Sequence, residues 1–232
     1  MINNKPDIRL NKFVALATGC PRRQADEWIE AGKITINGNT ARLGARISKD
    51  DVVKLNDSRL VLQPMLYIAL NKPTGFVCSR KKQDDTETIY KLLPKQYHQL
   101  KSVGRLDKDS SGLILLTNDG DFTYRMTHPS FIKTKIYTVC LDRELQPLHQ
   151  QMVSDFGVML ADGKSKFTIE KSSSSPLQYT ITMHEGRNRQ IRRTFAALGY
   201  TVTMLHRTTF GEYQIGNLMS GEYSILNNLP SQ

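Results

Sequence analysis

The chain has 232 residues and a formal net charge of +10, from 32 Lys and Arg residues against 22 Asp and Glu residues. Hydrophobic residues make up 39% of it, too many for a disordered chain, and no apolar run approaches the ~18 to 20 residues of a membrane span. This length allows one medium and one small domain, and the charge favours a polyanionic partner. The first residues lack the apolar segment of a signal peptide, so we expect a cytoplasmic protein without a membrane partner.

The cysteines and histidines offer no metal site by their spacing. Cys20, Cys78 and Cys140 lie far apart and form no Cys-x-x-Cys pair, which indicates reduced thiols. The five histidines lack metal-ligand spacing, and no glycine-rich phosphate loop is present. We therefore expect neither a metal nor a cofactor.

The chain opens with two predicted helices. Residues 8–17 place apolar side chains on one face, and Pro21 is suited to open a second helix that ends before Gly32. Arg22 and Arg23 fall in the first turn of that helix, where the helix dipole disfavours cations. The pair indicates either a phosphate ligand or two solvated arginines.

A short sheet is predicted to follow these helices. Residues 33–36 alternate as a strand, Asn37-Gly38 is a strong hairpin signal, and a second strand signal lies within 45–55. Together with Arg-Leu-Asn-Lys-Phe and Arg-Arg-Gln-Ala-Asp in the helices, this pattern resembles the S4 RNA-binding domain. Pro21 departs from the serine that usually caps the second helix. Residues 56–65 are interpreted as a linker, although their Leu-Val-Leu core could add a strand.

The most informative stretch is residues 104–117, which begins Gly-Arg-Leu-Asp. Leu113–Leu116 reads as a buried strand, so Asp107 is expected on a loop anchored to the core. An aspartate at such a place is often only a turn residue. Around this stretch, strands are predicted at residues 66–70, 135–141, 166–170, 178–183 and 202–205, and helices at 86–93, 119–126 and 145–152.

A last helix is predicted within residues 185–199, with Ile191, Phe195 and Leu198 as its buried stripe. The helical phase turns Arg189 and Arg193 toward solvent or a ligand. It places Arg192 on the flank, where the side chain can reach a buried carboxylate.

Four motifs in this order resemble the pseudouridine synthases, in the branch that modifies ribosomal RNA. They are the turn at 71–75, the Gly-Arg-Leu-Asp loop, Lys-x-Tyr at 135–137, and Arg-x-x-Gln-Ile-Arg-Arg at 187–193. The resemblance implies an α+β fold with an S4 domain in residues 1–57, a linker at 58–65, and a mixed, mainly antiparallel-sheet catalytic domain at 66–232. It also implies a monomer with a cleft that holds Asp107, and the turn at 71–75 would have an architectural role beside that loop.

The resemblance also assigns roles to individual residues. Asp107 would be the catalytic carboxylate and Arg192 its basic partner, because a nearby guanidinium favours the ionised form. Tyr137 would stack on the target base, although a strand tyrosine is otherwise most often a core residue. Further substrate contacts would come from Ile191 at the uracil ring, Arg105 at the flipped nucleotide, and Arg22, Arg23, Arg189 and Arg193 at phosphates.

Two other functional classes are compatible with the basic charge and the aspartate. A non-catalytic RNA-binding or ribosome-assembly protein could carry an S4 domain but would not need Asp107, Tyr137 and Arg192 together. A glycoside hydrolase would need a second carboxylate, for which Asp109 is the nearby candidate. Within the synthases, the length and Leu205–Arg207 resemble the small-subunit enzyme, and residues 187–190 and 106–110 its large-subunit relatives. We favour 16S over 23S ribosomal RNA as the substrate.

Overall fold

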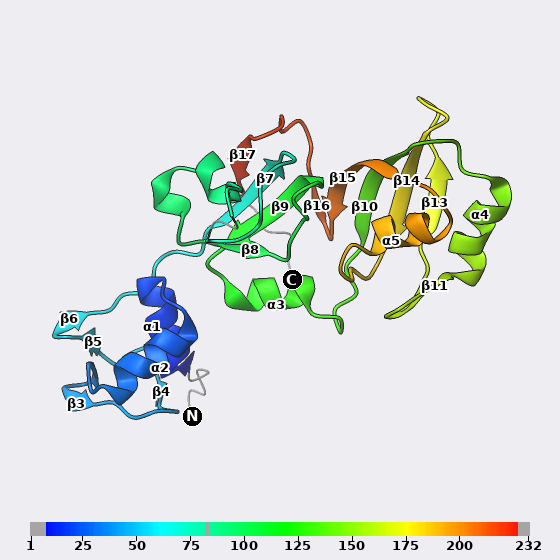
Figure 1. Cartoon of the computed structure of the whole chain (residues 1–232). Helices are drawn as coiled ribbons and strands as arrows, with labels where there is room; N and C mark the ends of the chain where they lie inside the picture. The colour runs from blue at the N-terminus through cyan, green and yellow to red at the C-terminus, as the bar shows by residue number, and fades with distance from the viewer. Residues whose placement is uncertain (1–7, 82–83, 227–232) are drawn as a thin grey trace. The chain divides into compact units, whose positions relative to one another are not determined.

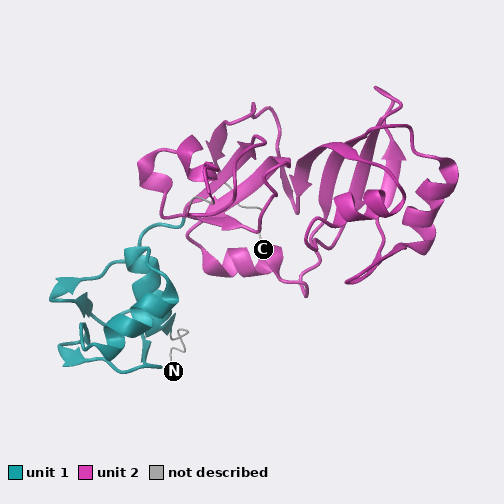
Figure 2. Ribbon diagram, viewed as in Figure 1, with its two compact units in different colours: residues 1–65 teal, residues 66–232 magenta. Residues whose placement is uncertain are grey.

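The structure is a computed structural model that describes residues 8–81 and 84–226. The chain forms two compact units, which divide between Met65 and Leu66 and are coloured separately in Figure 2. No helix within the described residues is long and apolar enough to cross a membrane.

The first unit consists of two helices and short strands. Its helices are α1 (Leu10–Thr18) and α2 (Arg22–Glu30). Its strands are β1 (Ile8–Arg9), β2 (Ile34–Ile36), β3 (Asn39–Thr40), β4 (Arg46–Ile47), β5 (Val53–Leu55) and β6 (Ser58–Arg59). Strands β3-β2-β5-β6 form one antiparallel sheet in that order, and β1 pairs with β4.

The predicted local signals form this unit. Both helices bury one face, through Leu10 and Val14 on α1 and through Ala25 and Ile29 on α2. Asn37 and Gly38 have φ values of 50° and 85°, so they form the tight hairpin turn expected between β2 and β3. The first helix begins two residues later than predicted, because its predicted start pairs with β4 as a strand.

The start of the linker was predicted too early. Ser58 and Arg59 pair with β5, and the Leu60 amide donates to the Val53 carbonyl at 2.9 Å. These residues therefore extend the sheet of the first unit, and their strand lies directly before the Leu-Val-Leu core in which the sequence had left a strand open.

The second unit contains the larger sheet. Its helical segments are η1 (Ile89–Leu92), η2 (Lys95–Tyr97), α3 (Gly120–Thr127), α4 (Pro147–Gln151), η3 (Met152–Phe156) and α5 (Gln190–Ala197). Its strands are β7 (Tyr67–Lys72), β8 (Lys101–Val103), β9 (Ser111–Thr117), β10 (Lys135–Leu141), β11 (Val158–Leu160), β12 (Gly163–Ser165), β13 (Thr168–Lys171), β14 (Gln178–Met183), β15 (Val202–Phe210), β16 (Tyr213–Gln214) and β17 (Tyr223–Ile225).

One mixed sheet runs through this unit in the order β13-β14-β10-β15-β9-β7-β17 (Figure 1). Among the residues that the structure describes, neighbouring strands of this sheet are antiparallel, except that β9 and β15 are parallel. This mixed, mainly antiparallel sheet confirms the predicted fold class. At the parallel pair Gly112 lies opposite Arg207, and a Cβ on Gly112 would come within 2.2 Å of the Arg207 carbonyl oxygen. Glycine is therefore required where β15 approaches the strand that follows the Asp107 loop.

The sheet is covered on both faces near β7 and β9. Alternate residues of β7 and β9 belong to two hydrophobic clusters, with Ile114 in one and Leu115 in the other. The larger cluster includes Phe195 of α5, and the smaller includes Phe122 of α3. Helix α3 thus lies against β8, which precedes the Asp107 loop, and α5 lies against β15 and β11.

Three local predictions for this unit need correction. Residues 86–93 contain the short 3-10 helix η1 and no α-helix, and α4 is brief and continues into the π-helical turn η3. The hairpin β11–β12 was missed, although Asp162-Gly163 is a hairpin turn signal. Its strands are three residues each, too short to show a clear alternation.

Candidate active site

Asp107 lies on the loop that joins β8 to β9, as the sequence predicts. Gly104 opens this loop with a φ of 71°, and the Ser110 amide closes a turn by donating to the Asp107 carbonyl at 3.1 Å. The Asp107 side chain is 33% exposed. The loop therefore presents a carboxylate at the surface while its backbone is fixed.

A buried lysine holds the backbone of the Asp107 loop by hydrogen bonds. Lys72, at the end of β7, has no exposed area, and its Nζ donates to the carbonyls of Asp107 at 3.0 Å and Ser110 at 2.5 Å. Burial lowers the pKa of Lys72. The turn at 71–75 also contributes an amide, since Gly75 donates to the Lys108 carbonyl at 2.7 Å. This segment has the architectural role expected of it.

Arg192, on α5, contacts the same loop. It was predicted to pair with Asp107, but its carboxylate contact is with Asp109. Its Nη2 donates to the Asp109 carbonyl and its Nη1 to the Val202 carbonyl, both at 2.8 Å. Its Nε lies 3.3 Å from the Asp109 carboxylate. The flank position on α5 was predicted correctly, but the carboxylate that it reaches belongs to the neighbouring aspartate.

Arg189 is the arginine closest to the Asp107 carboxylate, at 3.7 Å. It also donates two hydrogen bonds of 2.9 Å to Asp109, which lower the pKa of that carboxyl group. The sequence predicted that Arg189 points toward solvent or a ligand, and its side chain is exposed. Its contacts with the two aspartates were not predicted, because Arg189 is the N-cap of α5, with a left-handed φ of 46°, and lies outside the helical turn.

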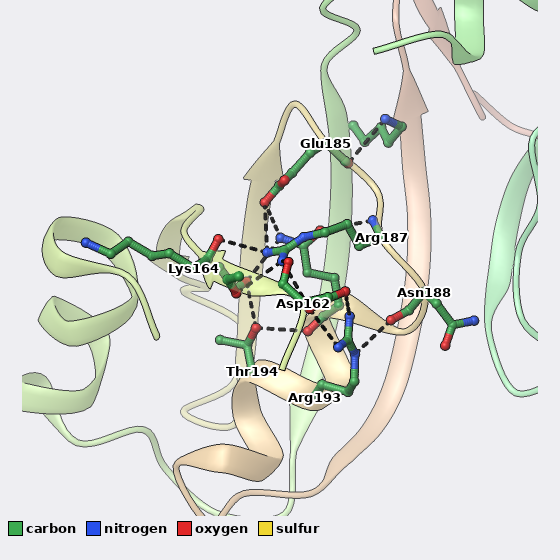
Figure 3. Close-up of polar contacts among 11 residues, drawn as sticks. Asp162, Lys164, Glu185, Arg187, Asn188, Arg193 and Thr194 are labelled. Carbon is green, nitrogen blue, oxygen red and sulfur yellow. Dashed lines mark hydrogen bonds and ion pairs between the residues drawn. The ribbon is translucent and has the colours of Figure 1, made fainter. Parts of the chain in front are cut away.

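Arg193, which was predicted to point toward solvent or a ligand, contacts a carboxylate as well. Its two Nη atoms donate to Asp162 at 2.9 and 2.7 Å, in the turn of the β11–β12 hairpin (Figure 3). Arg187 donates to the same aspartate at 3.1 Å and to the Gly163 and Lys164 carbonyls. These two arginines therefore attach the hairpin to the start of α5.

A cleft of about 540 Å³ opens above the Asp107 loop. Asp107, Arg105, Tyr137, Ile191 and Arg189 all line it, so the structure brings these five predicted residues together. Tyr137 and Ile191 are 7% and 4% exposed, and Arg105 is exposed. Arg192 and Arg193 are not among its lining residues. The cleft thus combines two accessible carboxylates, Asp107 and Glu185, with an aromatic wall and several cations.

Comparison with known proteins identifies the family. The family model described as RNA pseudouridylate synthase matches residues 66–197, and the S4 domain model matches residues 8–53. The ribosomal small subunit pseudouridine synthase A of Vibrio vulnificus is 35% identical over 94% of this chain and 96% of its own length. The chain belongs to the RNA pseudouridine synthase family.

Other relatives of this synthase carry different names. The ribosomal large subunit pseudouridine synthase B of Bacillus subtilis is 30% identical over 92% of this chain and 90% of its own length. A dual-specificity RNA pseudouridine synthase of Salmonella typhi is 34% identical over 95% of this chain and 76% of its own. A crystal structure of a pseudouridylate synthase, 35% identical, superposes with a TM-score of 0.67 over 95% of this chain and 96% of that one.

In the first unit of the synthase, Arg22 and Arg23 lie in the first turn of α2 and are exposed. Neither arginine contacts a carboxylate within the described residues. Their role at phosphates stays a prediction.

Several residues of the site were missed by sequence reasoning. Lys72 and Arg207 were quoted only as parts of motifs, and Asp162 was not considered. A lysine that directly follows an apolar strand is a signal for Lys72, because a buried cation must find acceptors. Among the described residues, no group of three His, Cys, Asp or Glu side chains is placed to hold a metal ion.

Proposed function

We propose that this synthase converts a specific uridine of ribosomal RNA into pseudouridine, and that the RNA is 16S. The observation that supports the reaction is the accessible Asp107 carboxylate in the same cleft as the buried Tyr137. The reaction breaks the N1–C1′ bond of the uridine, turns the base, and forms a C5–C1′ bond. The proton lost from C5 is balanced by one gained at N1.

In this proposal Asp107 acts on the ribose, either as the nucleophile at C1′ or as the base that removes a proton from C2′. Tyr137 stacks on the uracil, Ile191 packs at its edge, and Arg105 occupies the space that the flipped base leaves. Flipping the base costs a few kcal/mol, which the contacts in the cleft must offset. The guanidinium of Arg189 lies 3.7 Å from the Asp107 carboxylate, at the edge of the same cleft.

Arg192 and Lys72 have positioning roles in this mechanism. Between them they hold the carbonyls of Asp107, Asp109 and Ser110. A reactive group misplaced by about 1 Å can lose about 100-fold in rate, so a loop fixed at three carbonyls is a substantial contribution. The predicted catalytic role of Arg192 is therefore indirect.

The choice of 16S RNA rests on the Vibrio vulnificus relative, which is named for the small subunit and matches almost end to end. The Bacillus subtilis relative, named for the large subunit, favours 23S RNA as the alternative substrate. Mapping pseudouridines in both RNAs from cells with and without the protein decides between them. Loss of one site from 16S supports the proposal, and loss of a site from 23S alone contradicts the choice of RNA. No change in either RNA contradicts the proposed substrate class.

A further inference from the structure

Arg207 is a buried arginine that the mechanism above does not use. It lies on β15, is 3% exposed, and lines the cleft. Its Nε donates to the Leu113 carbonyl at 2.8 Å, and its Cζ lies 4.7 Å from the centroid of the Phe210 ring. These contacts fix the orientation of the side chain but supply no opposite charge.

The charge of Arg207 lacks a counter-ion in the described part of the chain. Its Nη2 is buried and makes no hydrogen bond there, and no carboxylate there forms an ion pair with it. By contrast, Arg187, Arg189, Arg192 and Arg193 each have a carboxylate oxygen within 3.3 Å of a guanidinium nitrogen. A buried guanidinium without an opposite charge or a full set of acceptors is costly, which points to a ligand that supplies both.

A second cation lies at the same ring. Lys135, on β10, lines the cleft, and its Nζ is 5.6 Å from the Phe210 centroid. That Nζ donates to the Glu185 carbonyl at 3.2 Å. Burial and, after it, the charge of Arg207 lower the pKa of Lys135, while the charge of Glu185 raises it to a smaller extent, so the two cations repel each other. An anion between them would remove that repulsion.

We propose that Arg207 and Lys135 bind a phosphate group of the nucleotide that enters the cleft. The inference rests on the proposed function in that the ligand is an RNA nucleotide. A phosphodiester carries one negative charge and acceptor oxygens that fit the planar fork of a guanidinium, with the ammonium as a second, point-like donor. A neutral uracil carbonyl would satisfy Nη2 but would leave the charge of Arg207 without an opposite charge.

The position of Arg207 assigns the phosphate to the target nucleotide. Tyr137 and Arg207 are direct neighbours across the β10–β15 ladder, and such pairs have Cβ atoms roughly 5 Å apart. Tyr137 and Asp107 line the same cleft. A phosphate at Arg207 would therefore hold the ribose between the stacked base and the Asp107 carboxylate.

The test is a titration of the full-length protein with uridine, uridine 5′-monophosphate and uridine 3′-monophosphate, followed by calorimetry or NMR. For the wild type, at least one monophosphate should bind about 10-fold more tightly than uridine, as expected for a charge-assisted hydrogen bond. Arg207→Met should abolish this preference, and Lys135→Met should reduce it. Arg207→Lys should retain part of it.

Arg143→Met is the matched control. Arg143 also lies 4.7 Å from an aromatic centroid, that of Tyr200, and also donates to a backbone carbonyl, but it lies outside the cleft lining and pairs with Asp142. Its removal should leave the preference for the monophosphate unchanged. If Arg207→Met does not fold, as judged by circular dichroism, Lys135→Met and Arg207→Lys decide the question.

The proposal is overturned if the wild type binds neither monophosphate more tightly than uridine, or if Arg207→Met and Lys135→Met keep the preference. Equal weakening of uridine and both monophosphates in Arg207→Met would assign the residue to the base and would also overturn it. These outcomes are independent of the pseudouridine maps. A phosphate preference that depends on Arg207, without any change in the ribosomal RNA maps, would contradict the proposed substrate and leave this inference standing.

Discussion

The two units contain similar basic sequence patterns in different surroundings. In the first unit, the adjacent Arg22 and Arg23 are exposed at the start of α2, with no carboxylate partner within residues 8–81 and 84–226. In the second unit, Arg189, Arg192 and Arg193 at the start of α5 each contact a carboxylate. Exposed, unpaired cations are suited to bind RNA phosphates, whereas paired ones are suited to fix a loop.

The difference between the two units predicts that substitutions can separate RNA binding from catalysis. Asp107→Asn should have the largest effect. The substitution keeps the size of the side chain and removes its charge. Turnover should fall by at least about 1,000-fold, while thermal unfolding and RNA affinity stay near wild type. Single-turnover assays on the modified RNA measure the first effect and filter binding the second. A rate near that of the wild type would remove Asp107 from the chemistry.

Lys72→Met should produce the next largest effect, because it removes the donor shared by the Asp107 and Ser110 carbonyls. We expect a loss of about 3 kcal/mol in the free energy of unfolding, with turnover falling as the loop loosens. Urea denaturation measures the stability. Lys91→Met, at a side chain that is 63% exposed, is the control and should change stability little. Similar unfolding midpoints for the two variants would contradict the role of Lys72 in holding the loop.

Arg192→Ala should lower kcat by about 100-fold and change KM much less, because it frees the loop without removing a group that lines the cleft. Arg192→Lys should recover little activity, since one ammonium cannot reach both the Val202 and Asp109 carbonyls as the guanidinium does. Steady-state kinetics on both variants test this. A loss confined to KM would place Arg192 with the RNA-binding residues.

Replacing Arg22 and Arg23 together by Gln should have the opposite result, with weaker RNA binding and an unchanged rate at saturating RNA. Each lost phosphate contact should reduce the slope of log affinity against log salt by about 0.7 to 0.9. Arg193→Gln is the comparison, because Arg193 pairs with Asp162 and should leave the salt slope unchanged. Equal slopes for both variants would show that the difference between the two units has no functional meaning.

The smallest effect is expected from the exposed Asp109–Arg189 pair. The hydrogen bonds from Arg189 lower the pKa of Asp109 in the folded protein, so the pair stabilises the fold above the ordinary carboxyl pKa of about 3.9. This contribution is lost as the pH falls through the lower, folded-state pKa. Asp109→Asn should therefore cost about 0.2–1 kcal/mol at pH 7, and the difference from wild type should shrink below about pH 4. Chemical denaturation at a series of pH values measures it.

The amino-acid sequence by itself determined the local elements and the motif that contains Asp107. Alternation predicted β10 at residues 135–141, the Asn37-Gly38 turn predicted the first hairpin, and the apolar run after Asp107 predicted a loop anchored to a strand. These features depend on backbone preferences and on side-chain periods of 2.0 and 3.6 residues, which act between near neighbours. The family motifs added the fold and most residues of the cleft.

The tertiary structure decided which arginine contacts which aspartate. Arg189 and Arg192 lie 80 and 83 residues from Asp109 in the chain. They meet because β15 pairs with β9 and brings α5 beside the loop, an arrangement that no local period encodes. Arg189 adopts a left-handed N-cap conformation outside the helical period, so the contacts of its side chain with Asp109 and Asp107 do not follow from helical phase. The order of the strands decides which charges meet, so a sequence pattern can name the cations but not their partners.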